Sequence, residues 1–208
     1  MKQIGIIGLG YVGLPLAIQF AKSGAKVLGL DVDQAKVDSL NKGKSYIKHI
    51  EHSVLQEHLQ AKRLEATVNF SRVRELEAVL ICVPTPLNQE HEPDLSYVLN
   101  TAKTIAPYLP QGIVVSLEST TYPGTTEDEL RPVLEEGSGL TAGTDFHLVY
   151  SPEREDPGNP ESQVAKIPKV IGGYTETCIE KGKEVYSIAI ETLVPVSSCR
   201  IAEATKLT

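Results

Sequence analysis

Cysteine, methionine and tryptophan are scarce in this 208-residue sequence, which has three cysteines, one methionine and no tryptophan. Cys82, Cys178 and Cys199 are an odd number at wide spacings without a C-x-x-C pair, so they predict neither a disulfide framework nor a zinc site. Cys82 lies inside an apolar segment, where cysteine usually behaves as a small buried hydrophobic residue. The five histidines also lack the spacing of a metalloenzyme motif. We therefore expect no metal site.

Positive charge is also in short supply, with 20 Lys and Arg residues against 27 Asp and Glu residues and a formal net charge of −7. A protein that follows nucleic-acid phosphates needs a basic face, and the basic residues here are scattered. No apolar run is long enough to cross a bilayer, and the first residues show no cleavable signal pattern. The composition therefore predicts a cytoplasmic globular protein with neither nucleic acid nor membrane as a partner.

The most informative segment runs from Lys2 to Asp31 and predicts a strand, a glycine turn, a helix and a second strand. An apolar run leads into Gly8-Leu9-Gly10-Tyr11-Val12-Gly13, and apolar residues then continue at mostly helical spacing. In a G-x-G-x-x-G turn of this kind, Gly8 makes the tight turn, Gly10 lets a pyrophosphate approach the backbone, and Gly13 lets the helix pack closely on the strand. The diphosphate would then lie at the positive N-terminus of the helix.

The context of this motif distinguishes it from a glycine-rich turn without a ligand. It follows a predicted strand, opens a predicted helix, and is followed 18 residues after Gly13 by Asp31, an acid at the end of the second strand. An acid at this position accepts hydrogen bonds from the hydroxyls of the adenosine ribose. Because it would also repel a 2′-phosphate, the sequence predicts NAD rather than NADP as the cofactor.

Segments of strand and helix character alternate along the rest of the chain. Further strands are predicted at residues 64–68, 78–83, 112–117, 146–150, 169–173 and 193–196, and further helices at 34–41, 53–62, 95–107, 176–191 and from 201. This alternation predicts an α/β fold, a Rossmann-like doubly wound, mostly parallel sheet with helices on both faces. We expect Ser71, Asp94 and either Thr125 or Thr126 to act as helix N-caps.

Polar and proline-rich segments follow three of the predicted strands. Val83-Pro84-Thr85-Pro86 ends one strand with a rigid turn, a dense run of hydroxyls from Glu118 to Thr126 follows the next, and a charged, proline-rich loop from Ser151 to Pro160 follows a third. Ligands of open α/β sheets bind at the carboxyl ends of the strands. Each segment is therefore a candidate ligand contact, although a plain strand-ending turn, a set of helix caps and a solvated loop explain the same residues.

These segments, together with residues 202–207, closely resemble in order and spacing the UDP-glucose/GDP-mannose dehydrogenase family. Members of this family are NAD-dependent enzymes that oxidise the sixth carbon of a nucleotide sugar from alcohol to carboxylate in two hydride transfers. The resemblance implies an NAD-binding domain over residues 1–198 and the start of a central interdomain helix over residues 199–208, about half of a usual member. The run Ser-Pro-Glu-Arg-Glu-Asp-Pro-Gly-Asn at residues 151–159 is most similar to the branch that acts on UDP-N-acetylglucosamine. The full-length protein is expected to be a homo-oligomer.

The resemblance also implies roles for single residues. Thr120 matches a threonine that helps to hold the catalytic water, Glu153 a glutamate that acts as acid and base near the sixth carbon, and Lys206 a lysine that stabilises oxyanionic intermediates. Glu153, Arg154 and Lys206 are also expected to bind the sugar, with Asn159 as a further donor. The nucleophilic cysteine of the family is expected beyond residue 208, because none of the three cysteines lies in its motif.

The glycine motif and the resemblance together predict the residues that contact NAD. They are Gly8, Gly10, Tyr11, Val12, Gly13, Asp31, Lys36, Val83, Pro84, Thr85, Ser119 and Thr120. Lys206 lies two residues from the end of the chain, where a helix frays, so we expect its ammonium to be loosely held. The chain alone is expected to bind NAD without oxidising a nucleotide sugar.

Two alternatives remain open at this point. UDP-glucose, UDP-N-acetylmannosamine or a galacto epimer are alternative substrates, because most contacts with the sugar and the uridine would come from the absent half. A non-catalytic NAD-binding module that senses or regulates is the alternative from a different functional class.

Overall fold

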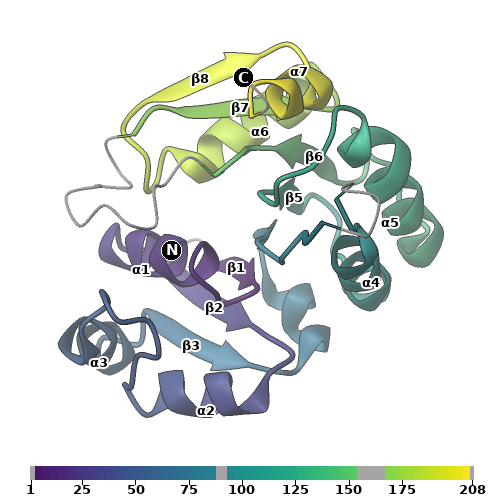
Figure 1. Cartoon of the computed structure of the whole chain (residues 1–208). Helices are drawn as coiled ribbons and strands as arrows, with labels where there is room; N and C mark the ends of the chain where they lie inside the picture. The colour runs from purple at the N-terminus through teal and green to yellow at the C-terminus, as the bar shows by residue number, and fades with distance from the viewer. Residues whose placement is uncertain (1–2, 88–92, 154–166, 207–208) are drawn as a thin grey trace.

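The computed structural model describes residues 3–87, 93–153 and 167–206, which form one sheet with helices on both faces (Figure 1). Its eight strands have the order β3-β2-β1-β4-β5-β6-β7-β8. The strands are β1 (Gln3–Ile7), β2 (Lys26–Leu30), β3 (Leu64–Thr67), β4 (Ala78–Ile81), β5 (Val114–Leu117), β6 (His147–Tyr150), β7 (Lys169–Gly173) and β8 (Leu193–Val196). The α-helices are α1 (Gly13–Lys22), α2 (Gln34–Asn41), α3 (His52–Gln60), α4 (Ser96–Ile105), α5 (Arg131–Ser138), α6 (Glu176–Tyr186) and α7 (Cys199–Ala204). Shorter helical segments are η1 (Phe70–Glu75), η2 (Ala106–Tyr108) and the π-helical η3 (Thr125–Leu130).

The chain starts in the middle of the sheet and builds it outward in two directions. β1 pairs with β2 on one side and with β4 on the other. Neighbouring strands are parallel except β6 and β7, where Val149 lies opposite Gly173. The strand order therefore reverses between β1 and β4, and ligands of doubly wound folds bind at the carboxyl ends of the strands at this point. The structure confirms the predicted α/β class and the mostly parallel sheet.

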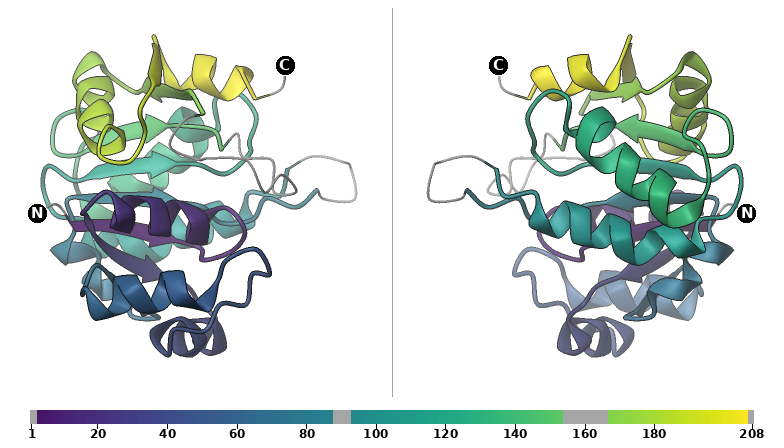
Figure 2. Two further views of the ribbon diagram at one scale, coloured as in Figure 1. Left: turned by 90° about the vertical axis from the view of Figure 1, so that its left-hand side faces the viewer. Right: turned by 90° about the vertical axis from the view of Figure 1, so that its right-hand side faces the viewer.

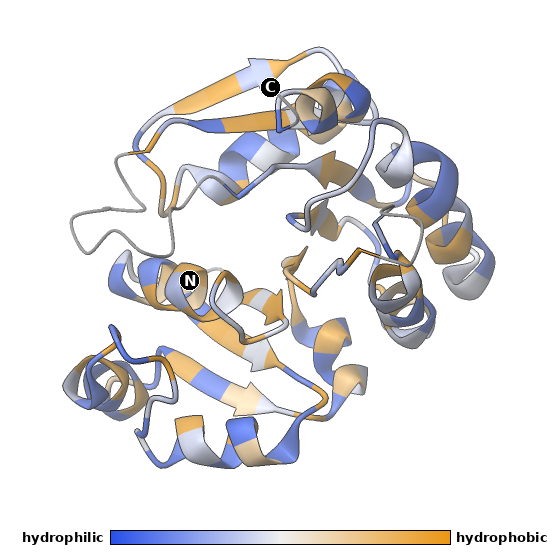
Figure 3. Ribbon diagram, viewed as in Figure 1, coloured by the Kyte–Doolittle hydropathy of each residue, from blue (hydrophilic) through white to orange (hydrophobic). Residues whose placement is uncertain are grey.

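The central strands are apolar on both faces, as expected for strands covered by helices on either side. Ile4 and Ile6 of β1 belong to a core that α1, α3 and α6 cover, whereas Ile7 belongs to a second core against α4, α5 and α7. Figure 2 shows α1 and α6 on one side of the sheet and α4 and α5 on the other, and Figure 3 shows apolar strands between helices of mixed polarity. Phe20 of α1 and Tyr186 of α6 pack together in the first core, with ring centroids 6.4 Å apart.

Local hydrogen bonds at the starts of η1 and α4 only partly match the predicted caps. Asn69 caps η1, since its side chain accepts from the backbone N–H of Ser71 at 3.1 Å, so the prediction that Ser71 is the cap is wrong. Asp94 accepts from the backbone N–H of Ser96 at 2.9 Å, but the N-cap position of α4 is Leu95, so the prediction that Asp94 is the N-cap is also wrong. The predicted helix from residue 176 is shorter than expected, because α6 ends at Tyr186.

Thr125 and Thr126 do not cap a helix, which corrects the sequence prediction. They begin η3, whose N-cap position is Gly124 in the left-handed conformation at φ 105°. The Thr125 hydroxyl donates to the carbonyl of Tyr122 at 2.8 Å, and the Thr126 hydroxyl donates to the buried carboxylate of Glu203 at 2.6 Å. A partner distant in sequence has therefore replaced the local capping interaction that these hydroxyls often make.

Candidate functional site

A pocket of about 750 Å³ lies at the carboxyl ends of β1, β4 and β5, beside the point where the strand order reverses. The glycine turn after β1, the end of β2 and the connections that follow β4 and β5 line it, together with Glu153 and Lys206 from farther along the chain. All of the predicted cofactor contacts line the pocket except Tyr11 and Gly13. Thr120, Glu153 and Lys206, the three residues expected to be catalytic, also line it, so the fold brings them together.

The glycine turn is shaped by packing at two positions and by open space at a third. Gly8 has φ 89°, and a Cβ there would lie 2.7 Å from the carbonyl oxygen of Cys82, while a Cβ on Gly13 would lie 1.8 Å from the carbonyl oxygen of Gly8. A Cβ on Gly10 would meet no atom within 4 Å. The N-terminus of α1 has no side-chain cap and no acidic residue in its first turn. The turn therefore leaves room for a diphosphate at Gly10, beside the positive end of the α1 helix dipole.

Asp31 supports the glycine turn as well as facing the pocket. Its buried carboxylate accepts from the backbone N–H of Leu9 at 2.8 Å and from that of Asp33 at 3.0 Å, and the ammonium of Lys36 lies 3.8 Å away. A carboxylate has about four lone-pair positions, so acceptor capacity remains for ribose hydroxyls. Open space at Gly10, the uncapped helix and this acid fit a dinucleotide such as NAD.

Tyr46 is a second support of the glycine turn, and sequence reasoning missed it. Its hydroxyl donates to the carbonyl oxygen of Leu9, and its ring lies 6.0 Å from the ammonium of Lys36. Leu9 is thus held from both ends, by Asp31 at its N–H and by Tyr46 at its C=O. No local pattern around Tyr46 marks it for this role, because it comes from the connection between α2 and α3.

The segments after β4 and β5 are joined to each other by side-chain hydrogen bonds. The Thr85 hydroxyl donates to the carbonyl of Thr120 at 2.7 Å, and the Ser119 hydroxyl donates to the carbonyl of Val83 at 2.7 Å. The sequence left open whether the hydroxyls after β5 are helix caps or ligand donors. Ser119 instead joins its segment to the end of the neighbouring strand β4 by a hydrogen bond. This bond positions the part of the pocket wall that carries Thr120.

Glu153 and Lys206 meet at the pocket although they are far apart in sequence. The ammonium of Lys206 donates to the backbone carbonyl of Glu153, so this lysine contacts the pocket wall, and its loose attachment stays a prediction. The carboxylate of Glu153 lies 3.8 Å from the ammonium of Lys169. A cation, a carboxylate and the Thr120 segment are thus available together for chemistry that moves protons or stabilises a negative oxygen.

A buried charged network that sequence reasoning missed reaches the pocket through Glu118, which is one of its lining residues. The Lys169 ammonium is 2.7 Å from a carboxylate oxygen of Glu118, and both side chains are almost fully buried. The other oxygen of Glu118 accepts from the hydroxyl of Tyr186, which lies 2.7 Å from the Ser116 hydroxyl. Burial raises the pKa of Glu118 and outweighs the lowering effect of Lys169. A glutamate directly after an apolar strand was the one sequence signal for this network.

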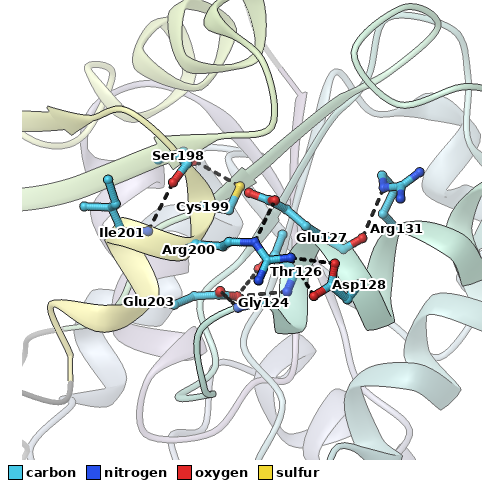
Figure 4. Close-up of polar contacts among 11 residues, drawn as sticks. Gly124, Thr126, Glu127, Asp128, Arg131, Ser198, Cys199, Arg200, Ile201 and Glu203 are labelled. Atoms are coloured by element: carbon cyan, nitrogen blue, oxygen red, sulfur yellow. Dashed lines mark hydrogen bonds and ion pairs between the residues drawn. The ribbon is translucent and has the colours of Figure 1, made fainter.

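The position of Lys206 depends on α7, which a buried carboxylate anchors to η3 (Figure 4). Glu203 accepts from the backbone N–H of Gly124 at 2.6 Å, from that of Thr126 at 2.8 Å and from the Thr126 hydroxyl at 2.6 Å. Burial raises the pKa of Glu203, while these three hydrogen bonds act in the opposite direction. Because Lys206 follows α7 within one turn, the anchor holds its ammonium near Glu153.

The exposed side of α7 adds a second set of contacts with η3. Arg200 lies 3.2 Å from a carboxylate oxygen of Glu127 and 2.6 Å from one of Asp128, and Ser198 caps the helix by accepting from the backbone N–H of Ile201 at 3.2 Å (Figure 4). Arg200 and Asp128 are solvent-exposed, so these ion pairs stabilise the contact less than the buried carboxylate does.

Several predicted residues lie away from the pocket or outside the described ranges. Tyr11 is 62% exposed and packs beside His49, with ring centroids 6.4 Å apart, and Gly13 acts through the packing of α1 on the turn. Arg154 and Asn159 lie outside the described residues. Within residues 3–87, 93–153 and 167–206, no group of three or more His, Cys, Asp or Glu side chains is placed to hold a metal ion. Over the same ranges, none of the helices has the length and apolarity that a membrane span requires.

Comparisons with known proteins agree with this geometry. The profile of the UDP-glucose/GDP-mannose dehydrogenase family, NAD binding domain, matches residues 2–190. The UDP-N-acetyl-D-glucosamine 6-dehydrogenase of Salmonella typhi is 38% identical over 206 residues, which are 99% of this chain and 48% of that protein. The UDP-N-acetyl-D-mannosamine dehydrogenase of Escherichia coli strain K12 is 39% identical over 212 residues, covering 99% and 50%. The solved structure of UDP-D-ManNAc dehydrogenase from Pyrococcus horikoshii superposes with a TM-score of 0.92 at 34% identity, covering 99% and 49%.

The chain spans about half the length of the curated relatives it matches. The family profile extends from the first strand to beyond the end of α6. It therefore includes the glycine turn, Asp31 and the hydrogen-bonded segments that follow β4 and β5. These are the features that shape the dinucleotide pocket. The chain therefore belongs to the UDP-glucose/GDP-mannose dehydrogenase family, of which it carries the NAD-binding domain.

Proposed function

We propose that this chain is the NAD-binding half of a dehydrogenase that oxidises the C-6 hydroxyl of a UDP-N-acetylhexosamine, UDP-N-acetylglucosamine first among them, to the uronate. The observation that carries the proposal is one pocket lined both by the glycine turn and by Thr120, Glu153 and Lys206. Relatives described as acting on UDP-N-acetyl-D-glucosamine and UDP-N-acetyl-D-mannosamine are 38% and 39% identical to the chain, which supports the substrate class and leaves the two epimers to be tested.

The chemistry divides between the cofactor and the protein. NAD, when bound, accepts hydride from the sugar carbon. Lys206 stabilises negative charge that develops on the substrate oxygen, because an ammonium in a pocket partly shielded from water acts more strongly than in bulk solvent. Glu153 accepts the hydroxyl proton and positions water, and Thr120 helps to hold that water. These assignments combine the family resemblance with the proximity of the three side chains in the pocket.

Oxidation to the carboxylate requires a nucleophile that traps the intermediate aldehyde, and we assign it to residues outside this chain. Cys82, Cys178 and Cys199 are all buried. Burial also raises the pKa of the Cys82 and Cys199 thiols, which keeps them neutral and unreactive. We assign α7, which Ser198 caps, to the start of the interdomain helix that leads to the second half of the protein.

The test is a pair of measurements on two lengths of the protein. The chain extended to the length of its relatives should reduce two NAD per molecule of UDP-N-acetylglucosamine, followed by NADH absorbance, and UDP-N-acetylmannosamine and UDP-glucose serve as competing substrates. Residues 1–208 alone should bind NAD by calorimetry without turnover. Faster turnover of UDP-glucose would refute the proposed substrate class, and NAD binding without turnover of any nucleotide sugar by the extended protein would favour the non-catalytic module.

A further inference from the structure

Lys169 is a lysine buried inside the protein, at the start of β7. It is 5% exposed, and its ammonium lies 2.7 Å from Glu118 Oε2, 3.4 Å from the carbonyl oxygen of Pro152 and 3.8 Å from Glu153 Oε2. An ammonium is costly to remove from water unless several partners compensate it. Here two of the three partners belong to the segment that carries Glu153 into the pocket. Lys169 itself does not line the pocket, so any effect on chemistry acts through Glu153.

Glu118 is held in position from the other side. One of its oxygens accepts from Lys169, and the other accepts from the hydroxyl of Tyr186, which contacts Ser116 in turn. The Tyr186 ring also lies 5.5 Å from the Lys169 ammonium. Because β5, α6 and β7 each contribute one of these groups, neither Lys169 nor Glu118 is free to move toward or away from Glu153.

We propose that Lys169 is a positioning residue for the acid and base group of the pocket. It holds the Pro152–Glu153 segment through the Pro152 carbonyl and places its ammonium 3.8 Å from the Glu153 carboxylate, while Glu118 holds the lysine from the other side. The inference rests on the proposed function for the role of Glu153, and it adds a fixed, buried cation beside this residue.

The sign of the effect follows from the charges around Glu153. Lys169 on β7 and Lys206 after α7 favour its ionised form, and Glu118 after β5 opposes it. Tyr186 on α6 and Cys82 after β4 face the same cluster as neutral groups, because burial raises the pKa of both. Burial lowers the pKa of Lys169, but Glu118 and Glu153 outweigh it and raise the pKa, so the lysine stays charged. An opposite charge within about 4–6 Å lowers a carboxyl pKa by about 1 to 3 units.

The experiment measures the pKa of Glu153 directly, by NMR titration of residues 1–208 that contain 13C-labelled glutamate. The variant Glu153→Gln assigns the Glu153 signal. Glu118→Gln leaves the Lys169 ammonium in place and removes the carboxyl group that shares it with Glu153, so the pKa of Glu153 should not rise. Adding Lys169→Met to that variant removes the lysine charge as well, and the pKa should rise above that of the single variant by about 1 unit or more. The double variant removes both charges of the Glu118–Lys169 pair. Replacing both members of a buried ion pair usually costs little stability.

The matched control replaces an exposed pair of the same kind on α6. Glu180 and Lys183 are 3.0 Å apart and exposed, so Glu180→Gln with Lys183→Met should leave the Glu153 titration unchanged. A pKa of Glu153 that rises in Glu118→Gln overturns the inference even if the double variant does not fold. Equal values in the single and double variants also overturn it.

Turnover by the extended protein provides the functional measurement. The acidic limb of its pH profile should lie at higher pH in the double variant than in Glu118→Gln. A shifted Glu153 titration in an extended protein that oxidises no nucleotide sugar refutes the proposed function and leaves the positioning role intact. Active enzyme with an unmoved acidic limb in both variants refutes the positioning role and leaves the proposed function intact.

Discussion

Replacing Glu203 by glutamine tests whether one buried carboxylate anchors α7 to η3. The carboxylate receives three hydrogen bonds, from the N–H of Gly124, the N–H of Thr126 and the Thr126 hydroxyl. The glutamine amide has one acceptor oxygen, which can keep the Thr126 contacts, and an NH2 group, which then faces the N–H of Gly124. That backbone donor loses its partner while it stays buried.

The magnitude follows from this arrangement. A buried donor without a partner costs about 1–3 kcal/mol, and bonds to Thr126 that become neutral each lose about 1 kcal/mol. Relief of the desolvation that raises the pKa of Glu203 offsets part of this loss. We therefore expect Glu203→Gln to lower the free energy of unfolding by about 2 kcal/mol, which corresponds to a decrease of about 4–8 °C in Tm for a domain of this size.

The assay is urea unfolding of residues 1–208 followed by circular dichroism, with Arg200→Ala as the matched control. Arg200 lies on the same helix and contacts the same segment, but it is exposed, so its loss should reduce stability less than the loss of Glu203 does. Equal unfolding midpoints for Glu203→Gln and the parent would refute the reasoning, as would a larger effect of Arg200→Ala. Either outcome would mean that the apolar contacts of α7 hold it without the carboxylate.

Four further substitutions test the cofactor site and the pH dependence of the fold. Asp31→Ala should weaken NAD binding by about one to two decades and reduce discrimination against NADP, because a charged hydrogen bond contributes about 1.5–3 kcal/mol. Calorimetry with both cofactors measures these affinities. Equal affinities of the parent for NAD and NADP would contradict the prediction. Gly13→Ala should lower both Tm and NAD affinity, because its Cβ would lie 1.8 Å from a backbone oxygen. Gly10→Ala should lower NAD affinity with little change in Tm, because its Cβ would meet open space. Equal Tm values for the two variants in thermal unfolding would show that the turn adapts. Burial lowers the pKa of His58, whose ring nitrogens have no hydrogen-bond partner among the described residues. The unfolded chain therefore binds a proton at this histidine before the folded chain does, and stability should fall as pH drops below about 6.5. His58→Leu should flatten this dependence in thermal unfolding between pH 7 and 5, and an unchanged slope would assign it to other groups.

The sequence by itself determined the features that depend on residues close together in the chain. The glycine motif, the strand after it and the acid at its end lie within 31 residues, so their spacing predicted both the turn and the preference for NAD. The alternation of strands and helices determined the α/β class, because apolar runs with helical patterns between them form a parallel sheet only with helices on its faces. The family resemblance added Thr120, Glu153 and Lys206, which the structure then brought to one pocket.

Only the tertiary structure decided which polar groups meet in the interior. Glu203 contacts Thr126 across 77 positions of sequence, and Lys169 contacts Glu118 across 51. Such partners depend on strand order and on where α7 packs, and no local spacing records either. The same reason explains why Thr126 does not cap a helix as predicted. Its hydroxyl could make a local capping bond, but it donates instead to the buried carboxylate of Glu203, which also accepts from the N–H groups of Gly124 and Thr126.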